Sequence, residues 1–164
     1  MGIAENLNSI NNSLPDSVKL IAVSKFNPAE KVIEAIKAGQ TVFGENRIQE
    51  AAPKFDLIRS QGYEAELHII GSLQRNKVKE AVRIATMIQS ADRLELIEEI
   101  EKQCSKINKK IQILFEMHTG EESKSGFTSS EEVFNDKCIP LQFNGKDTTL
   151  TDRKNKIQSR VSLC

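Results

Sequence analysis

Residues 41–70 read TVFGENRIQEAAPKFDLIRSQGYEAELHII, and this stretch decides the fold. It opens with a short apolar run, Thr41–Gly44, and closes with a second one, Leu67–Ile70. Between them, Asn46–Ser60 repeats apolar residues at helical spacing and ends before the turn pair Gln61-Gly62. Two strands separated by a helix of about 10–15 residues are typical of a βαβ unit in a parallel sheet.

The same alternation continues on both sides of this unit. We predict a leading helix at Ile3–Ser13, then five strands with helices between them. The predicted strands are Val18–Ser24, Thr41–Gly44, Leu67–Ile70, Met87–Ser90 and Ile111–Met117. The predicted connecting helices are Pro28–Ala38, Asn46–Ser60, Gln74–Ala85 and Arg93–Ile107. This order predicts an α/β fold, specifically a parallel (β/α) barrel-type array.

The length of the chain limits how complete such a barrel is. An eight-stranded (β/α) barrel typically needs about 250 residues and at least about 200, whereas this chain has 164. We therefore predict an incomplete TIM barrel, with about five of the eight strands, in a domain over residues 1–135. The periodicity fades after Phe127, and residues 136–164 are predicted to form a divergent, poorly ordered tail. The first strand would keep a free edge that favours association.

Composition excludes several classes of protein. The 23 Lys and Arg residues balance 23 Asp and Glu residues, which argues against a nucleic-acid partner held by bulk charge. Nowhere do about 18 apolar residues follow one another, so we expect no membrane partner. Residues 1–20 lack the pattern of a secretory signal. The cysteines, Cys104, Cys138 and Cys164, have the spacing of neither a disulfide framework nor a zinc site. We expect a cytoplasmic protein, with the mitochondrion as the alternative.

Lys25 is the first candidate for chemistry because it follows the first predicted strand directly. Active sites of parallel α/β folds lie at the carboxyl ends of the strands. A lysine walled in by a strand and its loops is partly desolvated, and its amine then reacts more readily to form a Schiff base. The alternative is an ordinary surface lysine beyond a strand.

Two further polar residues have an ordinary structural explanation when each is taken alone. Asn46 follows the second strand and suits the N-cap of the next helix. His68 lies inside the third strand among apolar neighbours, where a buried, hydrogen-bonded histidine is the usual occupant. Together with His118 it has no carboxylate or cysteine at ligand spacing, so we expect no metal site.

Five motifs in register on five predicted strands carry a family resemblance. They are AVSKF (22–26), FGENRIQEAAPK (43–54), HIIGSLQRNK (68–77), QSADR (89–93) and GEESKSGF (120–127). In this order they resemble the pyridoxal-phosphate homeostasis protein family, which is related to the barrel domain of alanine racemase. The resemblance covers about Val18 to Phe127.

The resemblance implies pyridoxal 5'-phosphate (PLP) as the cofactor and assigns roles to four residues. Lys25 matches the lysine that forms the Schiff base, and Asn46 matches the asparagine that lines the cofactor. His68 and Ser90 match residues expected to border the pocket. Family members also hold the phosphate with a Ser/Gly-rich loop and a helix N-terminus, and an arginine faces the pyridine nitrogen. Nothing in Thr128–Cys164 matches these features.

The resemblance implies a PLP-binding protein of intracellular vitamin B6 homeostasis, without catalysis and with apo PLP enzymes as the recipients of the cofactor. Family members are expected to be monomers. One alternative is a truncated, weakly binding or non-functional isoform, favoured by the loss of pattern after Phe127. A further alternative is a racemase-like PLP enzyme, which needs a second acid/base residue such as tyrosine. The one tyrosine, Tyr63, falls in a predicted loop away from the carboxyl rim, and this disfavours the enzyme.

Overall fold

A computed structural model of the chain describes residues 2–118, 120 and 125–129, together with the backbone of residues 161–163. Its sheet has the strand order β1-β2-β3-β4-β5-β6. Five strands run parallel to one another: β1 (Ala22–Val23), β2 (Val42–Glu45), β3 (Glu66–Ile69), β4 (Met87–Ala91) and β5 (Ile111–Phe115). The predicted parallel α/β array is therefore confirmed. The sheet is not closed, as expected for an incomplete barrel.

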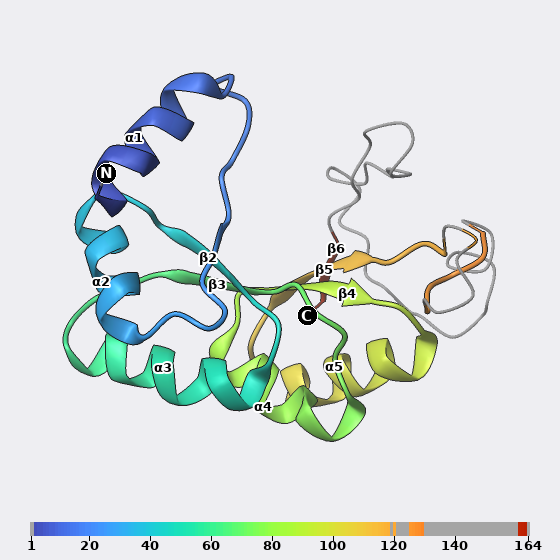
Figure 1. The fold of residues 1–164 in the computed structure, drawn as a ribbon. Coiled ribbons are helices and arrows are strands. Elements are labelled where there is room, and N and C mark those ends of the chain that lie inside the picture. Colours follow the sequence, from blue (N-terminus) through green and yellow to red (C-terminus); the bar gives the residue numbers. More distant parts are fainter. Residues whose placement is uncertain (1, 119, 121–124, 130–160, 164) are drawn as a thin grey trace.

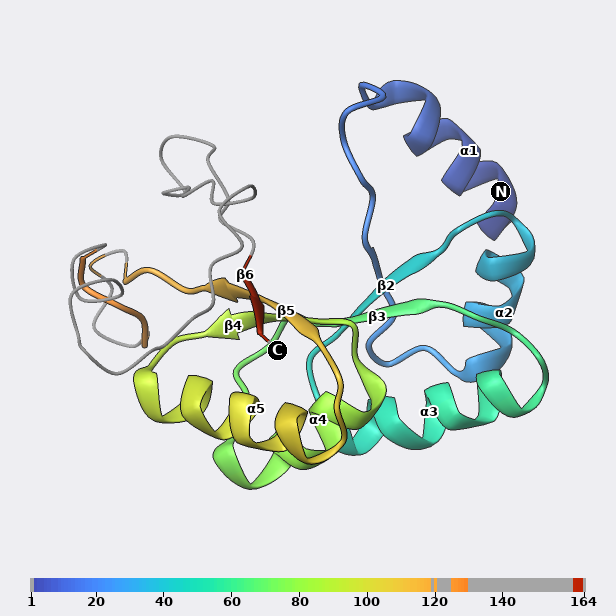
Figure 2. The ribbon, with the colours of Figure 1, turned by 180° about the vertical axis from the view of Figure 1, so that it is seen from behind.

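Helices alternate with the strands and cover one face of the sheet. They are α1 (Ile3–Ser13), α2 (Ala29–Lys37), α3 (Ile48–Ser60), α4 (Val78–Ile84), which a 3-10 turn η1 (Arg75–Lys77) precedes, and α5 (Leu94–Lys106). Figure 1 shows α3, α4 and α5 side by side below the sheet, and the view from behind in Figure 2 agrees. The leading helix α1 lies apart from this layer and contacts α2.

The core lies between the sheet and these helices. Phe43 of β2 meets Phe55 of α3 edge to face, with ring centroids 6.3 Å apart. Leu67 and Ile69 of β3 and Ile88 of β4 are likewise fully buried in the same cluster. Two-residue alternation sends these side chains to the helices and sends the residues between them to the opposite face.

The first strand is shorter than the predicted Val18–Ser24. The side-chain amide of Gln40 donates hydrogen bonds to the carbonyls of Leu20 (3.1 Å) and Val42 (2.6 Å). It thus links the approach to β1 with β2. The predicted fifth strand also ends early, at Phe115, after which Met117 makes an isolated bridge to Phe127.

A sixth strand was not predicted. β6 (Val161–Leu163) pairs antiparallel with β5, with Ile111 opposite Leu163. These three residues belong to the predicted tail over residues 136–164, which stays a prediction. The rest of that tail, and the predicted domain end at residue 135, lie outside the described residues. Within the described part, no helix is long and apolar enough to cross a membrane.

Candidate functional site

Lys25 and Asn46 leave the sheet at the same edge, the carboxyl ends of the parallel strands. Val23 of β1 lies opposite Gly44 of β2, and Lys25 and Asn46 each come two residues after this pair. Parallel strands share one direction, which is why residues far apart in sequence meet at this edge. Both residues therefore follow the carboxyl ends of their strands, while their roles toward a cofactor stay predictions.

A tight turn presents Lys25. The amide of Asn27 donates to the carbonyl of Ser24 (3.1 Å), and the Asn27 side chain donates to the carbonyl of Lys25 (3.3 Å). Phe26 has φ 63°, a left-handed conformation that few non-glycine residues adopt. The Lys25 amine lies 5.9 Å from the centroid of the Phe26 ring, within reach of a cation–π interaction. Lys25 is half-buried, whereas Phe26 is 78% exposed.

Asn46 and Ser90 are connected through Gly71, just beyond β3. A Cβ atom at Gly71 would lie 2.9 Å from both Cα and the carbonyl oxygen of Asn46, so only glycine fits against that residue. The Ser90 hydroxyl donates to the Gly71 carbonyl (2.6 Å). The ends of β2, β3 and β4 are thereby fixed to one another, and the Ser90 hydroxyl proton is engaged in this contact.

His68 lies deeper than the other predicted residues. It is opposite Gly44 in the register, two residues before the level of Asn46. Its Nδ1 lies 3.0 Å from the side-chain nitrogen of Gln89, and its Nε2 lies 3.8 Å from a carboxylate oxygen of Glu66. The structure thus brings Lys25, Asn46 and Ser90 to the rim and places His68 in the sheet below them.

Directly beneath the rim lies a cluster that the sequence analysis did not single out: Ser24, Glu45 and Lys54. The Lys54 ammonium donates to Glu45 Oε1 (2.7 Å) and to the carbonyl of Ser24 (3.0 Å), and the Ser24 hydroxyl donates to the same Oε1 (2.7 Å). Glu45 is fully buried, and the Lys54 side chain is only 10% exposed. The sequence signal was present, since Glu45 shares the helix-facing side of β2 with Phe43.

The QSADR and GEESKSGF motifs meet at the next part of the rim. Buried Asp92 accepts hydrogen bonds from Arg93 (2.6 Å) and from the Ser125 hydroxyl. Arg93 also donates to the carbonyl of Leu73 in the loop after β3 (3.2 Å). These bonds connect the loops that follow β3, β4 and β5.

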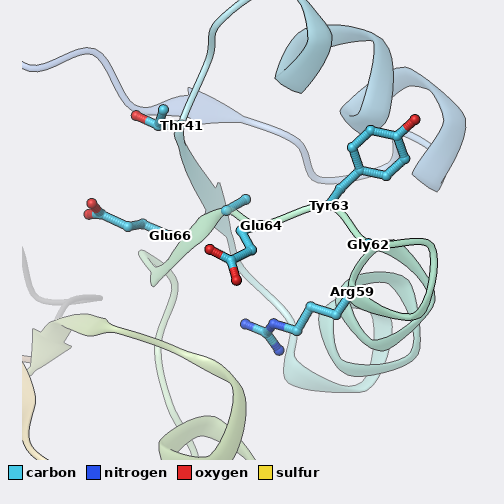
Figure 3. A pocket seen from close by; sticks show the side chains of 7 residues that line it. Thr41, Arg59, Gly62, Tyr63, Glu64 and Glu66 are labelled. Carbon is cyan, nitrogen blue, oxygen red and sulfur yellow. The ribbon is translucent and has the colours of Figure 1, made fainter.

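A separate hollow of about 560 Å³ lies at the opposite, amino ends of β2 and β3. Its lining includes Thr41, Arg59, Glu64 and Glu66, and Figure 3 shows Arg59 and Glu64 turned toward each other. The Tyr63 ring points away from this hollow, and the Lys37 amine lies 5.6 Å from the ring centroid. The single tyrosine therefore lies at the end of the sheet opposite Lys25.

Clusters of metal-ligating side chains were sought in the part of the chain that the structure describes. There, no three His, Cys, Asp or Glu side chains are grouped so that they could hold an ion. The candidate site is instead an amine at the rim, flanked by an amide and by hydroxyl-bearing loops.

Comparison with known protein families identifies the family of this chain. The model of the family described as "Alanine racemase, N-terminal domain" matches residues 2–139. The chain belongs to the alanine racemase N-terminal domain family. Among curated members, the pyridoxal phosphate homeostasis protein of Haemophilus influenzae is 34% identical over 142 residues, which is 80% of this chain and 60% of the relative. The protein of that name from Homo sapiens is 34% identical over 77% of this chain and 50% of its own length.

Solved structures of family members agree with the fold. PipY of Synechococcus elongatus, determined without PLP, has a TM-score of 0.73 and 36% identity, and the match covers 76% of this chain and 58% of PipY. A PipY structure with PLP bound matches with a TM-score of 0.70. The alanine racemase of Clostridium difficile matches with a TM-score of 0.61 at 16% identity, a likeness of fold alone. The motif-based resemblance is confirmed, and the chain spans about half to three-fifths of the length of the curated relatives that it matches.

Proposed function

We propose that this protein binds PLP as a Schiff base on Lys25 and serves intracellular vitamin B6 homeostasis without catalysing a reaction of its own. The observation that carries the proposal is the half-buried Lys25, held in a tight turn at the carboxyl rim to which β2 also brings Asn46. Relatives named pyridoxal phosphate homeostasis proteins, and a PipY structure with PLP bound, support it.

The residues at the rim suit the chemistry of PLP. PLP would supply an aldehyde at this rim, and the side-chain amine of Lys25 would hold it there. Asn46 offers an amide donor and acceptor beside that amine. We assign Asn46, His68 and Ser90 to the cofactor pocket. Ser90 would contribute by holding the Gly71 carbonyl in place, and His68 would lie below the cofactor, within the sheet.

Reduction with borohydride tests this assignment, because it turns the Schiff base into a stable amine that peptide mapping locates. PLP is added below the concentration of protein so that the most reactive lysine is labelled. We expect the label on Lys25 and its loss in Lys25→Met. Lys77→Met, which changes a lysine of η1, is the matched control and should label like the parent chain. A label mainly on another lysine of the parent chain would show that the site is wrongly assigned.

A racemase-like activity has weaker support. Racemisation needs an acid/base group on each face of the cofactor. Tyr63 lies at the amino ends of the strands, away from Lys25. Homeostasis, with apo PLP enzymes as recipients, is therefore our proposal in preference to catalysis. We propose a cytoplasmic location for the protein because its cysteines do not have the spacing of a disulfide framework. A weakly binding or non-functional form is the second candidate, since residues 128–164 lack the family's pattern.

A further inference from the structure

We propose that Lys54 is a positioning residue for Lys25. Its ammonium clamps the carbonyl of Ser24 against the buried Glu45 carboxylate, and this fixes the turn from which the Lys25 amine projects. This inference rests on the proposed function of Lys25 and extends it to a side chain of α3 that does not lie on the rim.

Every hydrogen-bonding group of Ser24 is engaged. Its amide donates to the carbonyl of Gly44 (3.0 Å) and its hydroxyl to Glu45 Oε1 (2.7 Å). Its carbonyl accepts from the Lys54 ammonium (3.0 Å) and from the amide of Asn27 (3.1 Å). Because the bond from Asn27 closes the turn over Lys25 and Phe26, the ammonium holds the oxygen on which that turn depends.

The turn needs such an anchor because Phe26 adopts φ 63°. A positive φ is expected at the third position of a type II turn, which glycine or asparagine normally occupies. A phenylalanine that is largely exposed gains little from burial there, so the neighbouring contacts must hold the conformation. The Ser24–Glu45–Lys54 cluster supplies those contacts from two directions, the end of β2 and the body of α3.

Stability alone does not account for a buried ion pair at this point. Removing both charges from water opposes folding, and apolar replacements of such pairs are often as stable or more so. Glu45 is fully buried, and its Oε2 has no hydrogen-bond partner among the described residues. We therefore attribute the buried Glu45–Lys54 ion pair to the position in which it holds Ser24.

A matched control exists in the same chain. The Lys109 ammonium also donates to main-chain carbonyls, those of Val82 (2.6 Å) and Ala85 (2.8 Å) at the end of α4. Lys109 precedes β5, at the amino ends of the strands, so it has no contact with the turn. Loss of either lysine removes an ammonium from main-chain oxygens, but only Lys54 touches the residue before Lys25.

The test compares Lys54→Met, the double variant Glu45→Gln/Lys54→Met and Lys109→Met. The double variant leaves no isolated buried charge and keeps an acceptor for the Ser24 hydroxyl, so it serves if the single variant does not fold. One readout is borohydride trapping of PLP at Lys25 under limiting PLP. We expect about tenfold less trapping in both Lys54 variants, the equivalent of one charge-assisted hydrogen bond. Lys109→Met should trap like the parent chain.

The second readout needs no cofactor. Amide hydrogen exchange of residues 25–27 should accelerate in both Lys54 variants while the amides of α5 keep their protection, a local change that general destabilisation would not produce. Folded Lys54 variants with parental trapping and parental exchange would overturn the proposal. If the parent chain fails to trap PLP at Lys25, the proposed function fails, and the exchange at residues 25–27 still decides whether Lys54 positions the turn.

Discussion

At the scale of the residue, Gly71 leaves no room for a single added methyl group. Replacing it with alanine would put Cβ 2.9 Å from the backbone of Asn46, so the two loops must separate. Crowding of this kind costs about 1–3 kcal/mol. We predict a lower midpoint of urea unfolding for Gly71→Ala, together with weaker trapping of PLP at Lys25, because Asn46 is displaced from the level of the amine.

Gly2→Ala is the matched control for this prediction, since nothing lies within 4 Å of a Cβ atom at Gly2. Its unfolding midpoint and its trapping should equal those of the parent chain. If Gly71→Ala behaved like Gly2→Ala in both measurements, the close contact between Gly71 and Asn46 would have no role in the site.

At the scale of the element, α5 contains a natural probe of local opening. Cys104 is fully buried on the face that carries Ile97 and Ile100, and burial raises the pKa of its thiol to about 11. At neutral pH such a thiol is about 100-fold less ionised than an ordinary cysteine, and the thiolate is the reactive form. In a chain carrying Cys138→Ser and Cys164→Ser, we predict very slow reaction of Cys104 with a thiol reagent, accelerating as the pH rises toward 11.

The neighbouring position supplies the comparison. Ser105 is exposed on the same helix, so Ser105→Cys in a chain without other cysteines should react at once. Denaturing urea should bring the two rates together. Equal rates in the native state would mean that α5 opens freely and does not form part of a stable core.

The elements were predictable where the signal is local. Buried parallel strands and helices with one apolar face repeat in sequence, and five strands follow from that repetition. β6 was missed because three residues at the end of a polar tail carry no pattern, and their partner β5 is distant in sequence. The contact of the Gln40 side chain with the Leu20 carbonyl, just before the shortened β1, is likewise invisible in a strand pattern.

The site was predictable to a similar degree. Lys25 and Asn46 share the rim because every parallel strand points the same way, a consequence of topology. The contact of Lys54 with Ser24 depends on how α3 packs against β1 and β2, which neither the motif nor the spacing specifies. The role of Gly71 likewise appears only when the ends of β2 and β3 are brought together.

For the whole molecule, the open sheet has a consequence at β1, whose one neighbour in the described sheet is β2. Val23 in β1 and Phe26 just beyond it are both largely exposed. Free strand edges with apolar side chains favour pairing with another chain. We therefore propose that the free edge of β1 promotes association between copies of this chain.

The affinity of the whole chain for PLP depends on phosphate contacts that the family resemblance implies and residues 128–164 lack. Residues 128–164 match neither the Ser/Gly-rich loop nor the arginine that the family resemblance implies for the cofactor. Each charge-assisted hydrogen bond to the phosphate contributes about 1.5–3 kcal/mol, so losing two weakens binding by about two to four powers of ten. We therefore predict a dissociation constant for PLP higher by that factor than the constant of PipY, measured by the same absorbance titration.

Titration with pyridoxal, which lacks the phosphate, identifies the cause. If the missing contacts are those to the phosphate, this chain should bind PLP and pyridoxal with nearly equal affinity, whereas PipY should prefer PLP strongly. A PipY chain shortened to the matching 58% is the control, and it should lose most of its own preference. A PLP affinity equal to that of intact PipY would mean that residues 128–164 rebuild a phosphate site, with Thr148, Thr149 and Arg153 as its first candidates.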